Sequence, residues 1–225
     1  MRLVTRGDLD GLTCSVLITS VEKVDAIELV HPQELTDGRF EVRDGDVLAN
    51  LPFHPSCSMW FDHHELVDAN ARPEAAFQGR YGLAPSTARL VHDYYCERKG
   101  WRLFERYGEL VAGTDRVDSA NLTRRDVLDP ERVILLGFTI DSRTGLSGFR
   151  DYFLFLGMAL RSMPLDEVIR SPQVTERVAK MREADEEFRK ALLASSRLEA
   201  NVVVTDFRDL SPIPIGNRFL VYTLF

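Results

Sequence analysis

The sequence has few cysteines and no long apolar segment. Its 225 residues include Cys14, Cys57 and Cys96, an odd number without the regular spacing of a disulfide framework or a zinc site. No apolar run approaches the roughly 18 residues that a membrane-spanning helix needs. The first ten residues already contain two acids, Asp8 and Asp10, which is unlike a secretory signal. These absences predict a cytoplasmic protein with reduced thiols and no membrane partner.

Basic charge is also scarce. The chain carries 28 lysines and arginines against 35 acids, a net charge of −7. Nucleic acids and anionic membranes both attract proteins with basic surfaces, so neither is expected as a general partner of this acidic chain. Sequence patterns typical of phosphate-binding loops, zinc proteases and serine hydrolases are missing as well. Apolar residues make up 44% of the chain, which is ordinary for a folded protein and too high for a disordered one.

Short apolar runs in the first third of the chain predict an α/β fold. Four runs have the length of strands: residues 2–5, 26–31, 46–51 and 58–62. A helix is expected at residues 12–21, and strands separated by helical stretches form parallel sheets. Ligands bind at the carboxyl ends of such strands, so the polar loops RGDLDG and DHHE are expected at one edge of the sheet.

The remaining sequence is mainly helical in pattern. Helices are predicted at residues 86–98, 101–112, 131–140 and 149–163. The polar stretch 165–200 predicts a long helix or helix pair, and residues 201–206 and 218–225 predict strands. The expected organisation is an α/β domain over residues 1–163 with a parallel sheet flanked by helices, and then a helical connector over 164–200. Residues 201–225 would begin a second α/β domain that this chain contains only in part.

Acids and histidines gather in the polar loops. Asp8 and Asp10 are separated by one residue, and Asp62 precedes the adjacent pair His63 and His64. Adjacent side chains at a strand end point to opposite faces, so one histidine can bind a metal while the other faces a substrate. Alternatively, Asp8 and Asp10 only cap the helix that follows them.

A third pair of acids, Asp115 and Asp118, is expected just past the end of a helix. Two carboxylates about 4 Å apart repel by roughly 4 kcal/mol at an effective dielectric near 20. If Asp115 meets the acids of the two loops, the cluster therefore needs a cation, a bound proton or an arginine. Oxygen and imidazole ligands favour manganese or magnesium, with zinc or cobalt as alternatives.

The loop segments TRGDLDG and DHH, followed by Asp115 in the segment DRVDSA, resemble motifs of the DHH phosphoesterase superfamily over roughly residues 1–160. The segments ANLPFHPSCSMWFDHHE and DSANLTRRDVLDP most resemble its exopolyphosphatase-related members. The resemblance implies a manganese-dependent hydrolase with one or two ions, magnesium or cobalt being alternatives. Its substrate would be a small phosphate ester or anhydride: polyphosphate, pyrophosphate, a nucleotide or a short oligonucleotide. Residues 201–225 would open the substrate-binding domain of that superfamily.

The resemblance also implies roles for individual residues. Asp8 would bind the first ion, and Asp10, His63 and Asp115 the second. Asp62 would orient the His63 ring, and His64 would contact the phosphate and protonate the leaving oxygen.

Two residues depart from the superfamily pattern. Arg6 stands where a histidine or aspartate is usual, and Asn50 stands where an aspartate usually bridges both ions. Arginine cannot bind a metal because it stays protonated, whereas asparagine can lend a neutral oxygen. Arg6 could instead fork onto the phosphate as a catalytic and substrate-binding residue. In the opposite interpretation, Arg6 pairs with Asp8 or Asp115 and the site only binds phosphate ligands.

Two further interpretations concern the rest of the chain. Arg116, Arg143 and Arg150 are candidate phosphate contacts. The stretch 165–200 could pair two chains as a homodimer, in which case the protein would act by interaction and need neither metal nor phosphate.

Overall fold

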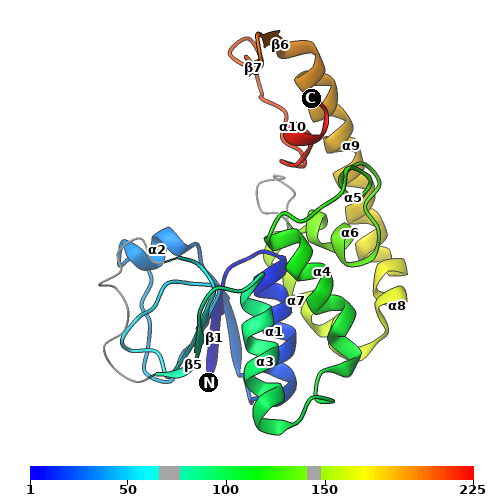
Figure 1. Ribbon diagram of the computed structural model, residues 1–225. Coiled ribbons are helices and arrows are strands. Elements are labelled where there is room, and N and C mark those ends of the chain that lie inside the picture. Colours follow the sequence, from blue (N-terminus) through cyan, green and yellow to red (C-terminus); the bar gives the residue numbers. More distant parts are fainter. Residues whose placement is uncertain (66–76, 141–147) are drawn as a thin grey trace.

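The computed structural model describes residues 1–65, 77–140 and 148–225. Its first part alternates strands with two helices, in the order β1 (Arg2–Thr5), α1 (Leu9–Val21), β2 (Ala26–Leu29), α2 (Pro32–Thr36), β3 (Val47–Ala49), β4 (Met59–Asp62) and β5 (Gln78–Tyr81). A helical part follows, with α3 (Thr87–Lys99), the 3-10 turn η2 (Glu105–Tyr107), α4 (Gly108–Asp118), α5 (Arg124–Leu128), α6 (Arg132–Thr139), α7 (Phe149–Ser162) and α8 (Leu165–Arg170). The chain continues into the long helix α9 (Pro172–Ser195), the strands β6 (Ser196–Glu199) and β7 (Val202–Thr205), and α10 (Leu220–Thr223) (Figure 1).

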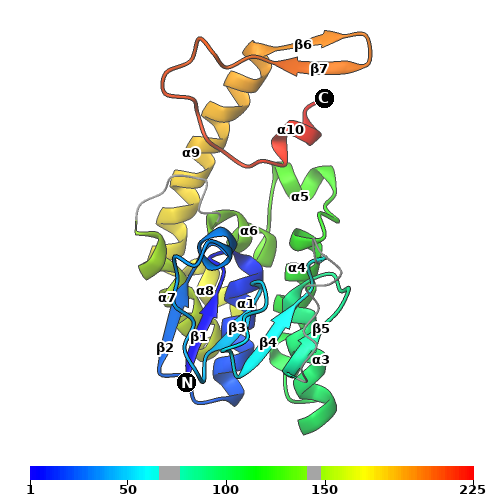
Figure 2. The same ribbon diagram turned by 90° about the vertical axis from the view of Figure 1, so that its left-hand side faces the viewer.

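The first five strands form one parallel sheet in the order β2-β1-β3-β4-β5 (Figure 2). The register pairs Thr5 with Ala49 and Ala49 with Phe61, so β1, β3 and β4 end level with one another. The loops that follow these strands therefore lie together at the carboxyl edge of the sheet. This confirms the predicted parallel α/β fold and the shared position of the RGDLDG and DHHE loops.

The two faces of the sheet are covered differently. Alternate strand residues point to opposite faces, and Leu3 and Phe61 are fully buried beneath α1, α3 and α7. On the other face, Val4 and Trp60 are fully buried under α2 and the loops around it. Burial of a side chain of this size stabilises the fold by about 1.5–3 kcal/mol.

Helix α1 is buried on all sides along residues 9–18. It lies between the sheet and helices α3, α4 and α7, which explains why its sequence is apolar or small all round rather than amphipathic (Figure 1). The start of α1 is therefore held rigidly against the sheet edge, and so are the acids that lie there.

The strand β5 is absent from the sequence prediction. Its residues Gln78 and Arg80 break any apolar pattern, because β5 lies at the end of the strand order and is only partly buried. Gly79 has a φ of 111°, and a Cβ there would lie 2.0 Å from the Trp60 carbonyl oxygen. A glycine inside a polar segment therefore marks a close backbone approach.

The helix predicted at residues 101–112 lies further along the chain. The 3-10 turn η2 occupies the middle of that stretch, and α4 runs from Gly108 to Asp118. Asp115 and Asp118 are consequently in the last turns of a helix, not past its end.

The predicted strand at 218–225 is wrong, because this segment contains the helix α10. Leu220 and Leu224 are spaced by one helical turn, and both belong to an apolar cluster with Val127 and Leu192. The predicted strand at 201–206 is confirmed as β7, and its antiparallel partner is β6.

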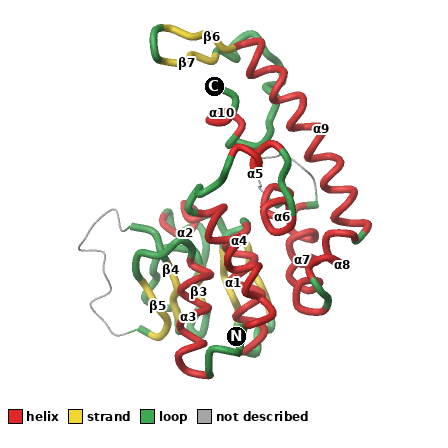
Figure 3. The backbone as a smooth tube through the Cα atoms, turned by 45° about the vertical axis from the view of Figure 1, so that its right-hand side comes forward, coloured by secondary structure: helices red, strands yellow, loops and turns green. Residues whose placement is uncertain are grey.

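The long helix α9 leads away from the sheet and carries the β6–β7 hairpin at its far end (Figure 3). Its buried apolar residues Val174, Met181 and Leu192 contact clusters of this same chain. Within the described part of the chain, no helix has both the length and the apolar character required to cross a membrane.

Candidate active site

The loop between β1 and α1 presents the first two acids. Asp8 is the N-cap of α1, and its Oδ1 accepts a hydrogen bond of 2.9 Å from the Gly11 backbone N–H. A Cβ at Gly11 would lie 1.9 Å from the Arg6 carbonyl oxygen, so the loop can fold back onto the helix only over a glycine. The capping role is thus confirmed for Asp8, whereas Asp10 lies in the first turn of the helix without capping it.

Asp10 is fixed by the N-terminus of another helix. Its side chain is buried, and its two oxygens accept hydrogen bonds from the backbone N–H groups of Thr87 (2.9 Å) and Ala88 (2.7 Å). These groups lie in the first turn of α3, where N–H groups have no partner inside the helix and carry partial positive charge. Helix α3 therefore orients the Asp10 carboxylate without neutralising it.

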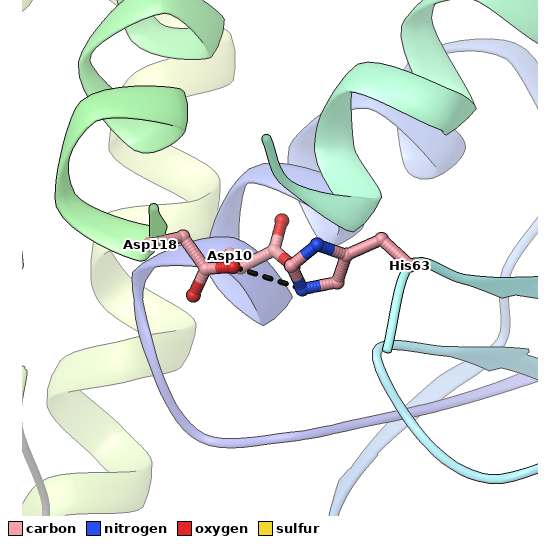
Figure 4. Close-up of side chains that lie close together, drawn as sticks. All are labelled: Asp10, His63 and Asp118. Carbon is pink, nitrogen blue, oxygen red and sulfur yellow. Dashed lines mark ion pairs between the residues drawn. The ribbon is translucent and has the colours of Figure 1, made fainter. Parts of the chain in front are cut away.

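His63 lies directly after β4 and faces this carboxylate. Its Nδ1 is 2.9 Å from the Ala84 carbonyl oxygen, which can only accept, so Nδ1 carries a hydrogen. The other ring nitrogen, Nε2, lies 2.9 Å from Oδ2 of Asp118 and 3.9 Å from Oδ2 of Asp10. Figure 4 shows both carboxylates directed at the imidazole ring.

Burial and mutual charge alter the acidity of this cluster. Desolvation is the largest cause of a raised pKa at Asp10, and the charges of Asp118 and Asp8 add to it. Desolvation lowers the pKa of His63, but the contacts with Asp118, the Ala84 carbonyl and Asp10 outweigh it and raise that pKa to about 9. The cluster therefore retains a proton near neutral pH.

The same cluster fits a divalent ion. One ligand atom from each of Asp10, His63 and Asp118 lies within 4.8 Å of the other two. Among the residues that the structure describes, none forms a hydrogen bond of regular geometry with the buried Nε2 of His63, and its near neighbours are the carboxylates of Asp118 at 2.9 Å and Asp10 at 3.9 Å. One imidazole nitrogen with two carboxylates is a donor set that suits manganese, with magnesium, cobalt or zinc as alternatives.

Asp62 contacts a different histidine ring from the one expected. Its Oδ1 lies 2.8 Å from Nδ1 of His64 and accepts a hydrogen bond of 3.0 Å from the His63 backbone N–H. The expectation that Asp62 orients the His63 ring is therefore corrected, because the Ala84 carbonyl occupies Nδ1 of that ring. The hydrogen bond between Asp62 and the His64 ring raises the pKa of His64, whose side chain is about half exposed. Asp62 thus holds the His64 imidazole at the surface of the site and favours its protonated form.

Asp115 does not lie in the cluster of Asp10, His63 and Asp118. Its Oδ1 accepts a 2.6 Å hydrogen bond from the Ser86 hydroxyl, and its Oδ2 accepts two from Arg89 at 2.5 and 3.0 Å. These partners on α3 occupy the carboxylate that the sequence analysis assigned to the second ion. Asp118, one turn further along α4, faces His63 in its place.

The predicted arginine contacts differ in position. Arg116 pairs with Asp126 at 2.5 Å and points away from the cluster, because it precedes Asp118 by two helical residues and these project about 200° apart. Arg150 lies close to the site, but it donates to the Ile27 carbonyl oxygen and lies 3.3 Å from Glu28. Arg143 lies outside the described residues.

Arg6, Asp8 and Asn50 form a second group beside the cluster. Nε of Arg6 lies 3.0 Å from Oδ2 of Asp8, and the Asn50 side-chain amide donates to Oδ1 of Asp8 at 2.9 Å. Asn50 has a φ of 59°, a left-handed conformation that asparagine tolerates better than most residues. Burial raises the pKa of Asp8, and the charge of Arg6 opposes that rise.

Both groups open into one cavity of about 730 Å³. Its near wall carries Arg6, Asp8, Asp10, His63, His64 and Asp118. Its far wall comes from α9 and the segment before α10, through Asp185, Asn217, Arg218 and Phe219. Phe138 and Phe149 add apolar surface between the walls. The cavity therefore joins a charged centre to aromatic surface.

Sequence reasoning noted Asp118 without assigning it to the ion, and it did not single out the far wall. The spacing of Asp115 and Asp118 by one helical turn was the available signal for Asp118. For Arg218 and Phe219 no comparable signal exists, since their meeting with the β1 loop depends on the direction of α9.

Comparison with solved structures shows that the chain is similar to the pGpG-specific phosphodiesterase PggH from Vibrio cholerae. The two chains are 36% identical and superpose with a TM-score of 0.82, over 99% of this chain and 74% of that one. No protein-family model and no curated protein matches this chain. The likeness extends over the sheet, the helices around it and the C-terminal segment.

Proposed function

Because the chain belongs to the DHH phosphoesterases, we propose that it is a divalent-metal-dependent phosphodiesterase that hydrolyses a small linear nucleotide. The observation that carries the proposal is the convergence of Asp10, His63 and Asp118 on one cavity wall, with His64 beside them. We expect a manganese ion in this three-ligand cluster, because one imidazole nitrogen and two carboxylates suit manganese.

A dinucleotide suits this cavity better than polyphosphate or pyrophosphate does. The cavity volume of about 730 Å³ lies in the range of small-molecule sites, and Phe138, Phe149 and Phe219 offer surface on which bases can stack. Inorganic phosphate chains would gain nothing from such surface. The similar protein is named for its action on pGpG, so a 5′-phosphorylated dinucleotide is the first substrate to test. The proposed reaction adds water to phosphorus, breaks one P–O ester bond and releases two mononucleotides.

We assign each residue a role in this reaction. Asp10, His63 and Asp118 hold the ion, which when bound supplies positive charge to the phosphate and favours attack by water. His64 is half exposed beside the cluster, Asp62 favours its protonated form, and it donates a proton to the leaving oxygen. Asp62 is a positioning residue that fixes the His64 ring through Nδ1.

The test is hydrolysis of pGpG by the protein after removal of metal and after addition of manganese, with polyphosphate and pyrophosphate as rival substrates. We expect cleavage of pGpG that needs the ion and that Asp10→Asn and His64→Gln both lose. Faster cleavage of polyphosphate would overturn the substrate assignment while preserving the metal-dependent reaction.

One observation favours a second function. The Asp8 carboxylate is occupied by Arg6, Asn50 and the Gly11 N–H, which suits a site that binds a phosphate ligand without turnover. Under that alternative, calorimetry would detect pGpG binding to the manganese-loaded protein while the products remain absent after long incubation.

A further inference from the structure

The residues around Asp8 do not fit a metal ion. A metal ion needs several acceptor atoms around it, so a carboxylate binds one where neighbouring side chains also offer acceptors. Asp8 instead receives the Gly11 N–H and the Asn50 amide on Oδ1, each at 2.9 Å, and the Arg6 guanidinium lies 3.0 Å from Oδ2. All of these neighbours are donors, and one is a permanent cation.

The orientation of the Asn50 side chain is also unsuited to a metal ion beside Asp8. Its NH2 group faces Asp8, and its buried Oδ1 has no hydrogen-bond partner among the described residues. An amide turned this way supports the carboxylate of Asp8 and does not join it as a second oxygen ligand. Of Arg6, Asp8 and Asn50, only Asp8 therefore offers a charged oxygen, and donors already bind it.

Arg6 is suited to act on a phosphate from this position. Its side chain is 37% exposed and lines the same cavity wall as His63 and Asp118. Its contact with Asp8 uses Nε, and among the described residues none hydrogen-bonds the two terminal NH2 groups of the guanidinium, which can fork onto phosphate oxygens. Asp8 thus holds the arginine in place much as a carboxylate holds a metal-binding histidine.

We infer that this protein has a one-ion centre, in which Arg6 is a phosphate-binding residue at the position of a second ion. The inference rests on the proposed function, since it takes Asp10, His63 and Asp118 as the site of the single ion. Beyond the proposed function, it specifies that one ion is bound and that Arg6 takes the place of a second ion.

The first test counts ions without measuring turnover. Metal-free protein is titrated with manganese by calorimetry, and the loaded protein is examined by electron paramagnetic resonance. We expect about one ion per chain with the six-line spectrum of an isolated manganese ion. In the double variant Arg6→His, Asn50→Asp, which restores an imidazole and a carboxylate, we expect two ions and a spin-coupled spectrum.

The outcomes separate the two claims. Two coupled ions in the wild-type protein would overturn the one-ion inference while supporting the proposed function. No bound ion would overturn the metal centre itself. The wild-type measurement decides the inference even if the double variant does not fold, which circular dichroism would reveal.

The second test concerns Arg6 alone and uses inorganic phosphate as the probe. On manganese-loaded protein, Arg6→Gln is expected to weaken phosphate binding by about 10- to 100-fold, because a charged hydrogen-bond donor is lost. Arg197→Gln is the matched control, since Arg197 lies exposed on β6 and pairs with Glu199 away from the cavity. Equal phosphate affinity in Arg6→Gln and the control would remove Arg6 from the binding site.

Discussion

Nε2 of His63 lies 2.9 Å from Oδ2 of Asp118, although one residue follows a sheet strand and the other ends a helix. The contact joins the edge of the sheet to α4, and Asp10 completes it from α1. Three elements that are distant in sequence thus supply one ligand atom each.

Substitution of Asp118 is expected to impair metal binding more than substitution of Asp115. Asp118→Asn removes a charged ligand and should lower manganese affinity by about 10- to 100-fold or more. Asp115→Asn should leave that affinity within about threefold, because Asp115 contacts Arg89 and Ser86 instead. It should reduce the free energy of unfolding by about 1 kcal/mol, since this ion pair is partly exposed. Calorimetry and urea unfolding measure the two effects, and the reverse ranking would return the ligand role to Asp115.

Manganese binding is expected to release a proton and to strengthen as pH rises. Contacts with Asp118, the Ala84 carbonyl and Asp10 outweigh desolvation and raise the pKa of His63 to about 9, so its imidazole is protonated at neutral pH. An ion must displace that proton, and affinity should increase up to tenfold per pH unit between about pH 6 and pH 9. Calorimetry in buffers of different ionisation enthalpy counts the protons released. Binding that is independent of pH and of buffer would contradict this reasoning.

The Asp62→Asn substitution is expected to lower the pKa of His64. The hydrogen bond from His64 to the Asp62 carboxylate is the main cause of the raised pKa, and a neutral amide cannot supply the same charge. Asparagine retains an oxygen that can accept the His63 backbone N–H, so the loop should keep its shape. Histidine titration by NMR would follow the ring, and an unchanged titration midpoint would argue against the contact.

Substitution of Gly11 by alanine is expected to destabilise the loop that presents Asp8 and Asp10. The added Cβ would lie 1.9 Å from the Arg6 carbonyl oxygen and 2.8 Å from the Thr5 hydroxyl oxygen, and the backbone must shift to avoid it. We expect a loss of about 3 kcal/mol in the free energy of unfolding. Gly108→Ala is the matched control, because a Cβ at this helical glycine meets nothing within 4 Å. Equal stability of the two variants in urea unfolding would show that the loop can relax.

Apolar runs of strand length, together with the polar loops between them, were enough to predict the first four strands and the parallel sheet. Apolar strand runs were bounded by polar loops, and the order of those loops indicated one shared edge. Strand β5 was not predicted, because its sequence QGRY has no apolar run. The segment of α10 was predicted as a strand, because a short apolar run fits the periodicity of a helix as well as that of a strand. In both cases packing against neighbouring elements decided the local structure.

The sequence alone predicts strands β1 to β4, the loop that carries Asp8 and Asp10, and the strand end that carries Asp62, His63 and His64. These follow from local rules of burial, capping and glycine geometry. Only the tertiary structure decided which carboxylate of α4 faces His63, since Arg89 on α3 binds Asp115 and leaves Asp118 for the cluster. It also decided that Asp62 contacts the ring of His64 and that Arg6 contacts Asp8. Such choices depend on distances between side chains of different elements, which the spacing of residues along one chain does not contain.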